Sequence, residues 1–271
     1  MNMPEHKEGR QPEQPIGLGE KSRRMLSSVL PFLNRTDKQT PLVPSAGEYP
    51  LTERLSFISK YVDEVSVDHV LSIFRTPGYN MLTPYFGLKI FDGQPTKQME
   101  MISTISNAIA EGGYTAAGKQ AADLLTSTEY ADAQLAKVSA KDITRISLRG
   151  PTIVENKAQE ILKKVINEDE TPVIIAYGGL LGLKAAIDNG RQGGQILIII
   201  PQSDNSAAVK QGYKLTKRDG EIDIDYLIQS DLETSAKLAL IDDSTSSGTT
   251  FTNTKRLFPN AIIQERTLFN D

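Results

Sequence analysis

The pattern of hydrophobic and polar positions changes at Gly150. Beyond it, short unbroken apolar runs alternate with stretches in which apolar residues recur every three or four positions, as on one face of a helix. The apolar runs lie within 172–176, 195–200 and 238–241, and 261–268 is interpreted as a closing strand. Continuous apolar strands are typical of a parallel sheet covered on both faces. We therefore predict an α/β domain with a parallel sheet over residues 151–271.

Residues 51–150 are predicted to form a mainly helical region. Apolar side chains recur at helical spacing over 96–110, and 114–125 is rich in alanine and leucine. A segment punctuated by glycine and proline, 76–95, interrupts the pattern, and we expect a short hairpin there, carrying Tyr85, Phe86, Leu88 and Ile90. His69 has no second metal or catalytic partner in view, so a packed or surface histidine is the favoured interpretation.

Residues 1–50 are predicted to be a mostly disordered tail. They hold seven of the fourteen prolines among polar and charged residues, a composition that buries too little apolar surface to offset its ordering entropy. An apolar island at 25–33 is interpreted as a transient helix or a segment that docks on its own protein; a partner-binding or membrane-surface patch is the alternative. The first residues lack a signal-peptide core and no apolar run spans a bilayer, so we expect a cytoplasmic protein.

The composition of the chain excludes several classes of catalytic and metal-binding site. The chain has 271 residues, 30 Lys and Arg against 34 Asp and Glu, a net charge of −4, no cysteine and two histidines. Disulfides, thiol catalysis and thiolate metal sites are therefore excluded, and no His-rich zinc site can be proposed. A slightly acidic chain without tryptophan also provides no basic field for nucleic acid, so we expect none as a partner.

The most informative segment follows the apolar run 238–241. Two acids, Asp242 and Asp243, are followed by a seven-residue loop, 244–250, that contains six hydroxyl residues and one glycine and opens a helical stretch. Backbone N–H groups and hydroxyls at such a position suit a phosphate. The two acids would repel a phosphate, but they suit the vicinal hydroxyls of a sugar or a magnesium ion. The residues themselves therefore indicate a sugar phosphate as ligand.

The segment Leu238–Thr250 resembles the 5-phosphoribosyl 1-diphosphate (PRPP) signature of the type I phosphoribosyltransferase family. The resemblance implies that Asp242 and Asp243 contact the ribose hydroxyls and face Mg²⁺, directly or through PRPP. It implies a 5-phosphate site made of Ser246, Ser247, Gly248, Thr249 and Thr250, and a catalytic set of Asp242, Asp243 and Ser246.

One departure from the family pattern follows the acid pair, and the next position bears on the substrate. Ser244 and Thr245 occupy positions that are usually apolar in the family. Members that act on 6-oxopurines carry an aspartate at the position of Ser246, so hypoxanthine and guanine are disfavoured here.

A second loop lies where the resemblance expects one. Ala176, Tyr177, Gly178 and Gly179 follow the first apolar run and resemble the family's pyrophosphate loop, in which glycines let backbone amides approach the diphosphate. The resemblance implies a cis peptide bond between Ala176 and Tyr177. Tyr177 stands where many members have a basic residue. Taken alone, this glycine pair would be equally consistent with a structural turn.

The polar stretch 201–222 lacks a clear period, and we expect it to be a long functional loop. In the family, a mobile loop at this place closes over the reaction centre. Lys210, Tyr213 and Lys214, with Lys217 and Arg218, are the candidates to meet the diphosphate charge. A solvated surface hairpin is the alternative for each of them.

The resemblance covers 151–271 and implies a phosphoribosyltransferase of nucleotide metabolism. It would transfer the 5-phosphoribosyl group from PRPP, with Mg²⁺, to a nitrogen acceptor such as a nucleobase and release pyrophosphate. Residues 51–150 would then be a cap or hood that holds the acceptor. A non-catalytic PRPP sensor is the first alternative, and an interaction protein on a degenerate fold is the second. We expect PRPP and a small-molecule acceptor as ligands and no association with a membrane. A homodimer is considered as an oligomeric state.

Overall fold

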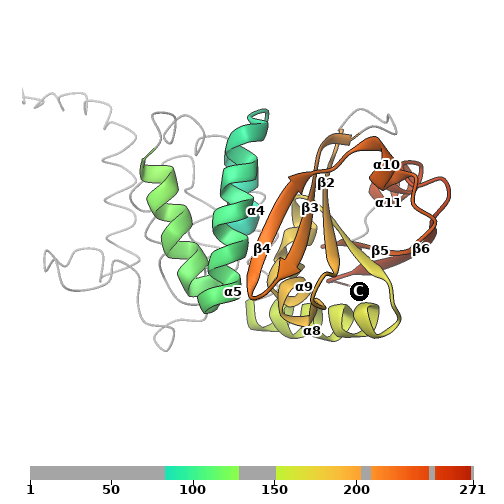
Figure 1. Cartoon of the computed structure of the whole chain (residues 1–271), viewed down its shortest axis with the longest axis horizontal. Helices are drawn as coiled ribbons and strands as arrows, with labels where there is room; N and C mark the ends of the chain where they lie inside the picture. Colours follow the sequence, from blue (N-terminus) through green and yellow to red (C-terminus); the bar gives the residue numbers. More distant parts are fainter. Residues whose placement is uncertain (1–82, 128–150, 203–208, 244–247, 270–271) are drawn as a thin grey trace, which may run out of the picture.

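A six-stranded mixed sheet organises the protein in the computed structural model, which describes residues 83–127, 151–202, 209–243 and 248–269 (Figure 1). The strand order is β4-β3-β2-β1-β5-β6. The strands are β1 (Thr171–Ile175), β2 (Gln195–Pro201), β3 (Val209–Arg218), β4 (Glu221–Tyr226), β5 (Lys237–Asp242) and β6 (Ile262–Thr267). The three apolar runs are β1, β2 and β5, and the predicted closing strand is β6, which confirms the prediction of these four strands.

Strands β2, β1, β5 and β6 form the parallel part of the sheet. Strand β1 pairs in parallel with β2 and β5, and β5 pairs in parallel with β6. Strands β3 and β4 extend the other side as an antiparallel hairpin. The fold is therefore α/β with a mostly parallel sheet, and the prediction of a purely parallel sheet misses this hairpin.

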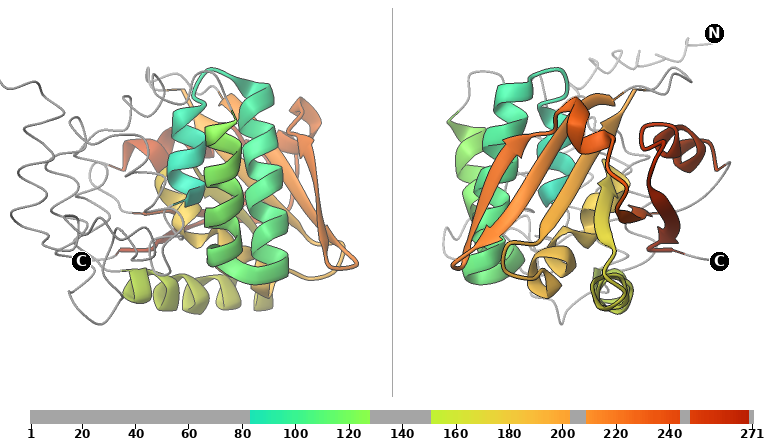
Figure 2. Two further views of the ribbon diagram at one scale, coloured as in Figure 1. Left: turned by 90° about the vertical axis from the view of Figure 1, so that its left-hand side faces the viewer. Right: turned by 45° about the vertical axis from the view of Figure 1, so that its right-hand side comes forward.

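The helices cover both faces of the sheet (Figure 2). They are α4 (Thr83–Ile90), α5 (Pro95–Thr126), α8 (Pro151–Asn167), the 3₁₀ helix η4 (Gly178–Gly182), α9 (Leu183–Asn189), α10 (Gln229–Leu232) and α11 (Thr249–Lys255). Alternate strand residues face opposite ways. Ile174, Ile198 and Ile241 join a core cluster with α4, α5, α8 and α9, which we call the α5 face. Val173, Leu197 and Leu240 join a smaller cluster with Phe251 and Phe258, which we call the α11 face.

The segment expected to hold a hairpin is a helix instead. Tyr85, Phe86, Leu88 and Ile90 are buried on α4, so the prediction of a hairpin there is wrong. The aromatic residues that favour a strand in isolation are placed by packing against α5, which overrides their local preference. The two helical stretches predicted after residue 95 are confirmed as α5, whose halves meet at a sharp bend at Gly113 (Figure 1).

The polar stretch 201–222 is also regular where the structure describes it. Lys210, Tyr213 and Lys214 lie within β3, so they are not part of a loop, and the prediction of a long irregular loop is wrong. Asp219 and Gly220, both with positive φ, form the two-residue turn to β4. The hairpin form, considered as the alternative, is the one observed.

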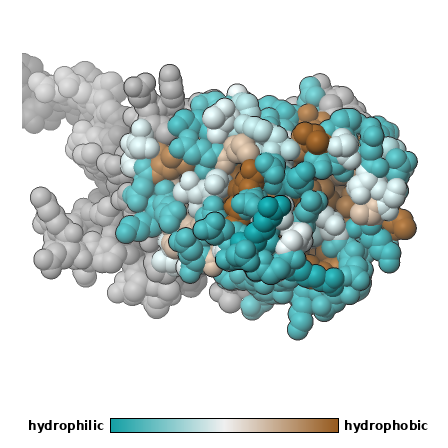
Figure 3. All heavy atoms as spheres, in the orientation of Figure 1, coloured by the Kyte–Doolittle hydropathy of each residue, from teal (hydrophilic) through white to brown (hydrophobic). Residues whose placement is uncertain are grey.

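Several predicted features lie outside the described residues. These are the tail 1–50 with its island 25–33, His69, and the loop residues Ser244, Thr245, Ser246 and Ser247. Among the helices that the structure describes, none combines the length and apolar character needed to cross a bilayer. The face shown in Figure 3 is mainly hydrophilic, with small and separate hydrophobic areas.

Candidate functional site

The two loops picked out in the sequence meet where the strand order reverses. From β1 the chain crosses over to β2 on one side, whereas β5 lies on the other side of β1. In open α/β sheets, ligands bind in the crevice outside the carboxyl ends of the strands at such a switch point. Because β1 and β5 are parallel, with Ile174 opposite Ile241, their carboxyl ends lie at the same edge. The loop after β1 and the acids after β5 are therefore neighbours.

The contact between these loops leaves room for glycine only. A Cβ on Gly178 would lie 2.5 Å from Asp243 Cγ and 2.9 Å from Asp242 Oδ1. A Cβ on Gly179 would lie 2.4 Å from the backbone oxygen of Ile241. The glycine pair therefore brings the backbone of the first loop directly against both carboxylates.

The acid pair is buried and held through its backbone. Asp242 and Asp243 are 9% and 3% exposed. The Asp243 N–H donates to Asp242 Oδ1 at 2.8 Å. Beyond the end of β6, the N–H groups of Leu268 and Phe269 donate to the carbonyl oxygens of Asp242 and Asp243 at 2.9 and 2.8 Å. These bonds fix both acids at the carboxyl edge of the sheet.

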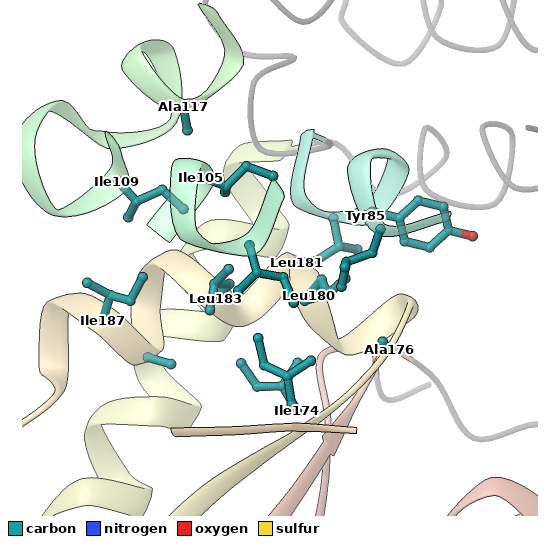
Figure 4. Close-up of a cluster of buried hydrophobic side chains, with 14 of the residues drawn as sticks. Tyr85, Ile105, Ile109, Ala117, Ile174, Ala176, Leu180, Leu181, Leu183 and Ile187 are labelled. Atoms are coloured by element: carbon teal, nitrogen blue, oxygen red, sulfur yellow. The ribbon is translucent and has the colours of Figure 1, made fainter. Parts of the chain in front are cut away.

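The first loop is anchored in the core of the α5 face. Leu180 and Leu181 are buried between Ile105 of α5 and Ile174 of β1 (Figure 4). The Ala176 N–H donates to the Ile199 carbonyl at 2.8 Å. Burial of these side chains and this backbone bond help to place the glycine pair.

The peptide bond between Ala176 and Tyr177 is cis, as the resemblance implied. The Tyr177 side chain packs into an aromatic group at α4, with its ring 6.2 Å from that of Tyr85 in an edge-on arrangement. Burial and the nearby Asp92 carboxylate raise the pKa of the Tyr177 phenol. The phenol is therefore neutral and lies among aromatic and acidic neighbours at α4.

The residues predicted to meet the diphosphate charge lie along β3 and contact different parts of the protein. Lys210 forms an ion pair of 2.7 Å with Asp92, in the turn after α4. Lys214 pairs with Asp231 of α10 at 3.0 Å. Tyr213 is fully buried, and its hydroxyl donates to the Pro95 carbonyl at 3.3 Å. Lys210 is the member placed near the first loop, because its partner Asp92 is also a neighbour of Tyr177.

The start of α11 follows the predicted order of strand, acids, loop and helix. Gly248 is the N-terminal flanking residue of α11, with φ of 68°, and its carbonyl accepts from the Thr252 N–H at 2.9 Å. Thr249 and Thr250 form the first turn of the helix. The left-handed backbone at Gly248 is one that glycine adopts without strain.

One polar residue at this edge was not predicted. Thr267, the last residue of β6, lies opposite Asp242 in the register. It is 7% exposed, and its hydroxyl has no hydrogen-bond partner among the described residues. Nothing in the sequence marks it, because threonine is an ordinary strand residue.

A separate pocket of about 170 Å³ lies at the opposite, amino edge of the sheet. Its lining includes Glu170, Arg191 and Lys217, so the predicted cation Lys217 lies at the edge away from the acid pair. In the described part of the chain, no three acidic or histidine residues converge as a metal site.

Comparison of the chain with models of protein families, with characterised proteins and with solved structures gives no match.

Proposed function

We propose that the protein binds PRPP with Mg²⁺ and transfers its phosphoribosyl group to a nitrogen acceptor. The observation that carries the proposal is the direct contact of Gly178 with Asp242 and Asp243 at the switch point of the sheet. Two loops that resemble the pyrophosphate and ribose-phosphate loops of one family come from distant parts of the sequence. Their contact supports interpreting them as one site.

The proposed roles follow from the chemistry of each group. Asp242 and Asp243 accept hydrogen bonds from the ribose hydroxyls. The amides of Gly178 and Gly179 approach the diphosphate, and the residues at 246–250 hold the 5-phosphate. Both carboxylates provide oxygen ligands that suit Mg²⁺, which usually binds to one or two carboxylates together with substrate phosphates. When bound, the ion would neutralise charge on the departing diphosphate.

The proposed reaction needs positioning more than a strong nucleophile. The bond from the anomeric carbon to the diphosphate oxygen breaks, and the diphosphate leaves with the electron pair. A nitrogen of the acceptor forms the new bond from the opposite face and releases its proton to solvent. Carboxylates fixed before the reaction stabilise the cationic sugar that develops, and backbone amides stabilise the negative charge on the departing diphosphate; such fixed groups are the main source of catalysis in sites of this kind. The absence of cysteine fits this chemistry.

A PRPP-binding regulatory protein is the second candidate, and the orientation of Tyr177 favours it. Where a basic residue would meet the diphosphate, the Tyr177 ring instead packs on Tyr85 beside Asp92. Lys210, the cation near this loop, is paired with the same Asp92. A site with this arrangement binds the sugar phosphate but binds the leaving diphosphate weakly.

Binding and turnover separate the candidates. PRPP binding to the full chain is measured by calorimetry with Mg²⁺, and pyrophosphate release is measured with a panel of nucleobases. Asp242→Asn and Asp243→Asn are each expected to weaken PRPP binding at least tenfold, whereas Asp225→Asn, on the exposed side of β4, leaves it unchanged. Binding without pyrophosphate release across the panel would select the regulatory protein. Absence of PRPP binding, or binding unaffected by both variants, would refute both candidates.

A further inference from the structure

The end of β6 carries a buried hydroxyl beside the acid pair. Thr267 Oγ1 has no hydrogen-bond partner among the described residues, and the residue is 7% exposed. Buried polar groups are usually paired, because leaving one without a partner forfeits the hydrogen bonds it makes in water. An unpaired hydroxyl at a candidate ligand site therefore calls for an explanation.

The strand register sets the direction of this side chain. Thr267 and Asp242 are opposite each other in the parallel pair β5 and β6, so their side chains leave the sheet on the same face. Glu265, two residues earlier, faces α11, as its ion pair of 2.6 Å with Lys255 shows. Thr267 continues that row toward the carboxyl edge, and the backbone bond from Leu268 N–H to the Asp242 carbonyl fixes the alignment.

The position of Thr267 separates it from Thr254 and Ser106, whose buried hydroxyls also have no partner among the described residues. Thr254 is fully buried in the last turn of α11, not at the start of the helix that follows the acids. Ser106 lies inside α5, packed among apolar residues. Thr267 alone, among the buried hydroxyls without partners in the described residues, is a register neighbour of a site carboxylate.

We propose that Thr267 is a further binding residue whose hydroxyl makes a hydrogen bond with an oxygen of the sugar phosphate. This rests on the proposed function, because the ligand is taken to be PRPP. The hydroxyl both donates and accepts, so it complements the adjacent carboxylates, which only accept when ionised. Its missing partner in the protein is supplied by the ligand.

The test compares three variants of the full chain. Thr267→Val removes the hydroxyl and keeps the shape, and Thr267→Ser keeps the hydroxyl. Thr254→Val removes an equally unpaired hydroxyl in the last turn of α11. Thr267→Val is expected to raise the Kd for PRPP with Mg²⁺ by about 3- to 10-fold, the range for one hydrogen bond, without lowering the Tm of the free protein. Thr267→Ser should bind PRPP as the unmodified chain does, and Thr254→Val should leave the Kd unchanged.

The outcomes distinguish this inference from the function on which it rests. If the unmodified chain binds PRPP and Thr267→Val stays within twofold of its Kd, the role of Thr267 is overturned while PRPP binding stands. The same holds if Thr267→Ser loses affinity as much as Thr267→Val, since the methyl group would then be responsible. If the unmodified chain does not bind PRPP, both proposals are overturned.

Discussion

Gly178→Ala tests the contact between the two loops most directly. The added Cβ would lie 2.5 Å from Asp243 Cγ and 2.6 Å from Asp243 Oδ1. Ordinary contacts of a Cβ begin at 3.4 Å, so the first distance is about 0.9 Å too short. Either the Asp243 carboxyl group rotates away or the first loop retreats from the acids. Both responses separate groups that the proposed ligand needs together.

The size of the effect follows from the overlap. Overpacking a closely packed site typically costs about 1–3 kcal/mol. For a domain of this size, each kcal/mol changes the Tm by about 2–4 °C, so a decrease of roughly 2–12 °C is expected. Displacing a carboxylate that accepts hydrogen bonds from the ligand should also weaken PRPP binding at least tenfold, which corresponds to about 1.4 kcal/mol or more.

Gly182→Ala provides the matched control within the same 3₁₀ helix. Its added Cβ would lie 3.6 Å from Leu162 Cδ2, an ordinary contact, so its Tm should be unchanged or slightly higher. Thermal unfolding and calorimetric PRPP titration are carried out on both variants. If Gly178→Ala matches Gly182→Ala in both measurements, the loop does not rest against the acids as described.

Two further predictions concern stability. Tyr114→Phe removes the hydroxyl that donates to the Leu181 carbonyl at 3.3 Å and accepts from the Lys184 N–H at 3.0 Å. Urea unfolding should show a decrease of about 1–3 kcal/mol in the free energy of unfolding, whereas the control Tyr226→Phe, at an exposed position of β4, should show no decrease. Equal stabilities of the two variants would contradict the role of the Tyr114 hydroxyl. Burial raises the pKa of the Glu170 carboxyl above its ordinary value of 4.5, so its ionisation opposes folding and stability should fall as the pH rises from about 4.5 through the raised pKa. In Glu170→Gln this part of the pH dependence should be absent from urea midpoints measured between pH 4 and 7, and an unaltered pH profile would refute the assignment.

The sequence predicts the central strands well because burial on both faces leaves an unmistakable pattern. Val173, Ile174 and Ile175 form one unbroken apolar run because alternate residues fill the α11 and α5 clusters. The same reasoning fails at β3, where only one face is buried and lysines occupy other positions. The pair Asp219 and Gly220 was the available signal, since this dipeptide favours a two-residue hairpin turn.

The sequence predicts each loop of the candidate site, but not the contact between the two loops. The acid pair and the glycine pair each follow an apolar run, so each is visible in the sequence. That Gly178 touches Asp243 depends on β1 and β5 being neighbours, which no local pattern gives. The pairing of Lys210 with Asp92 and the position of Thr267 beside Asp242 depend in the same way on tertiary packing.

The outer strand of the hairpin limits how copies of this chain can associate. Strand β4 pairs with β3 on one side, and no further strand pairs with its other side among the described residues. Its exposed residues Glu221, Asp223 and Asp225 recur at every second position. Two such edges brought together would align acids of like charge, and charged edge strands of this kind resist strand addition. If the chain forms a dimer, its sheet should therefore not continue through β4 into a second copy.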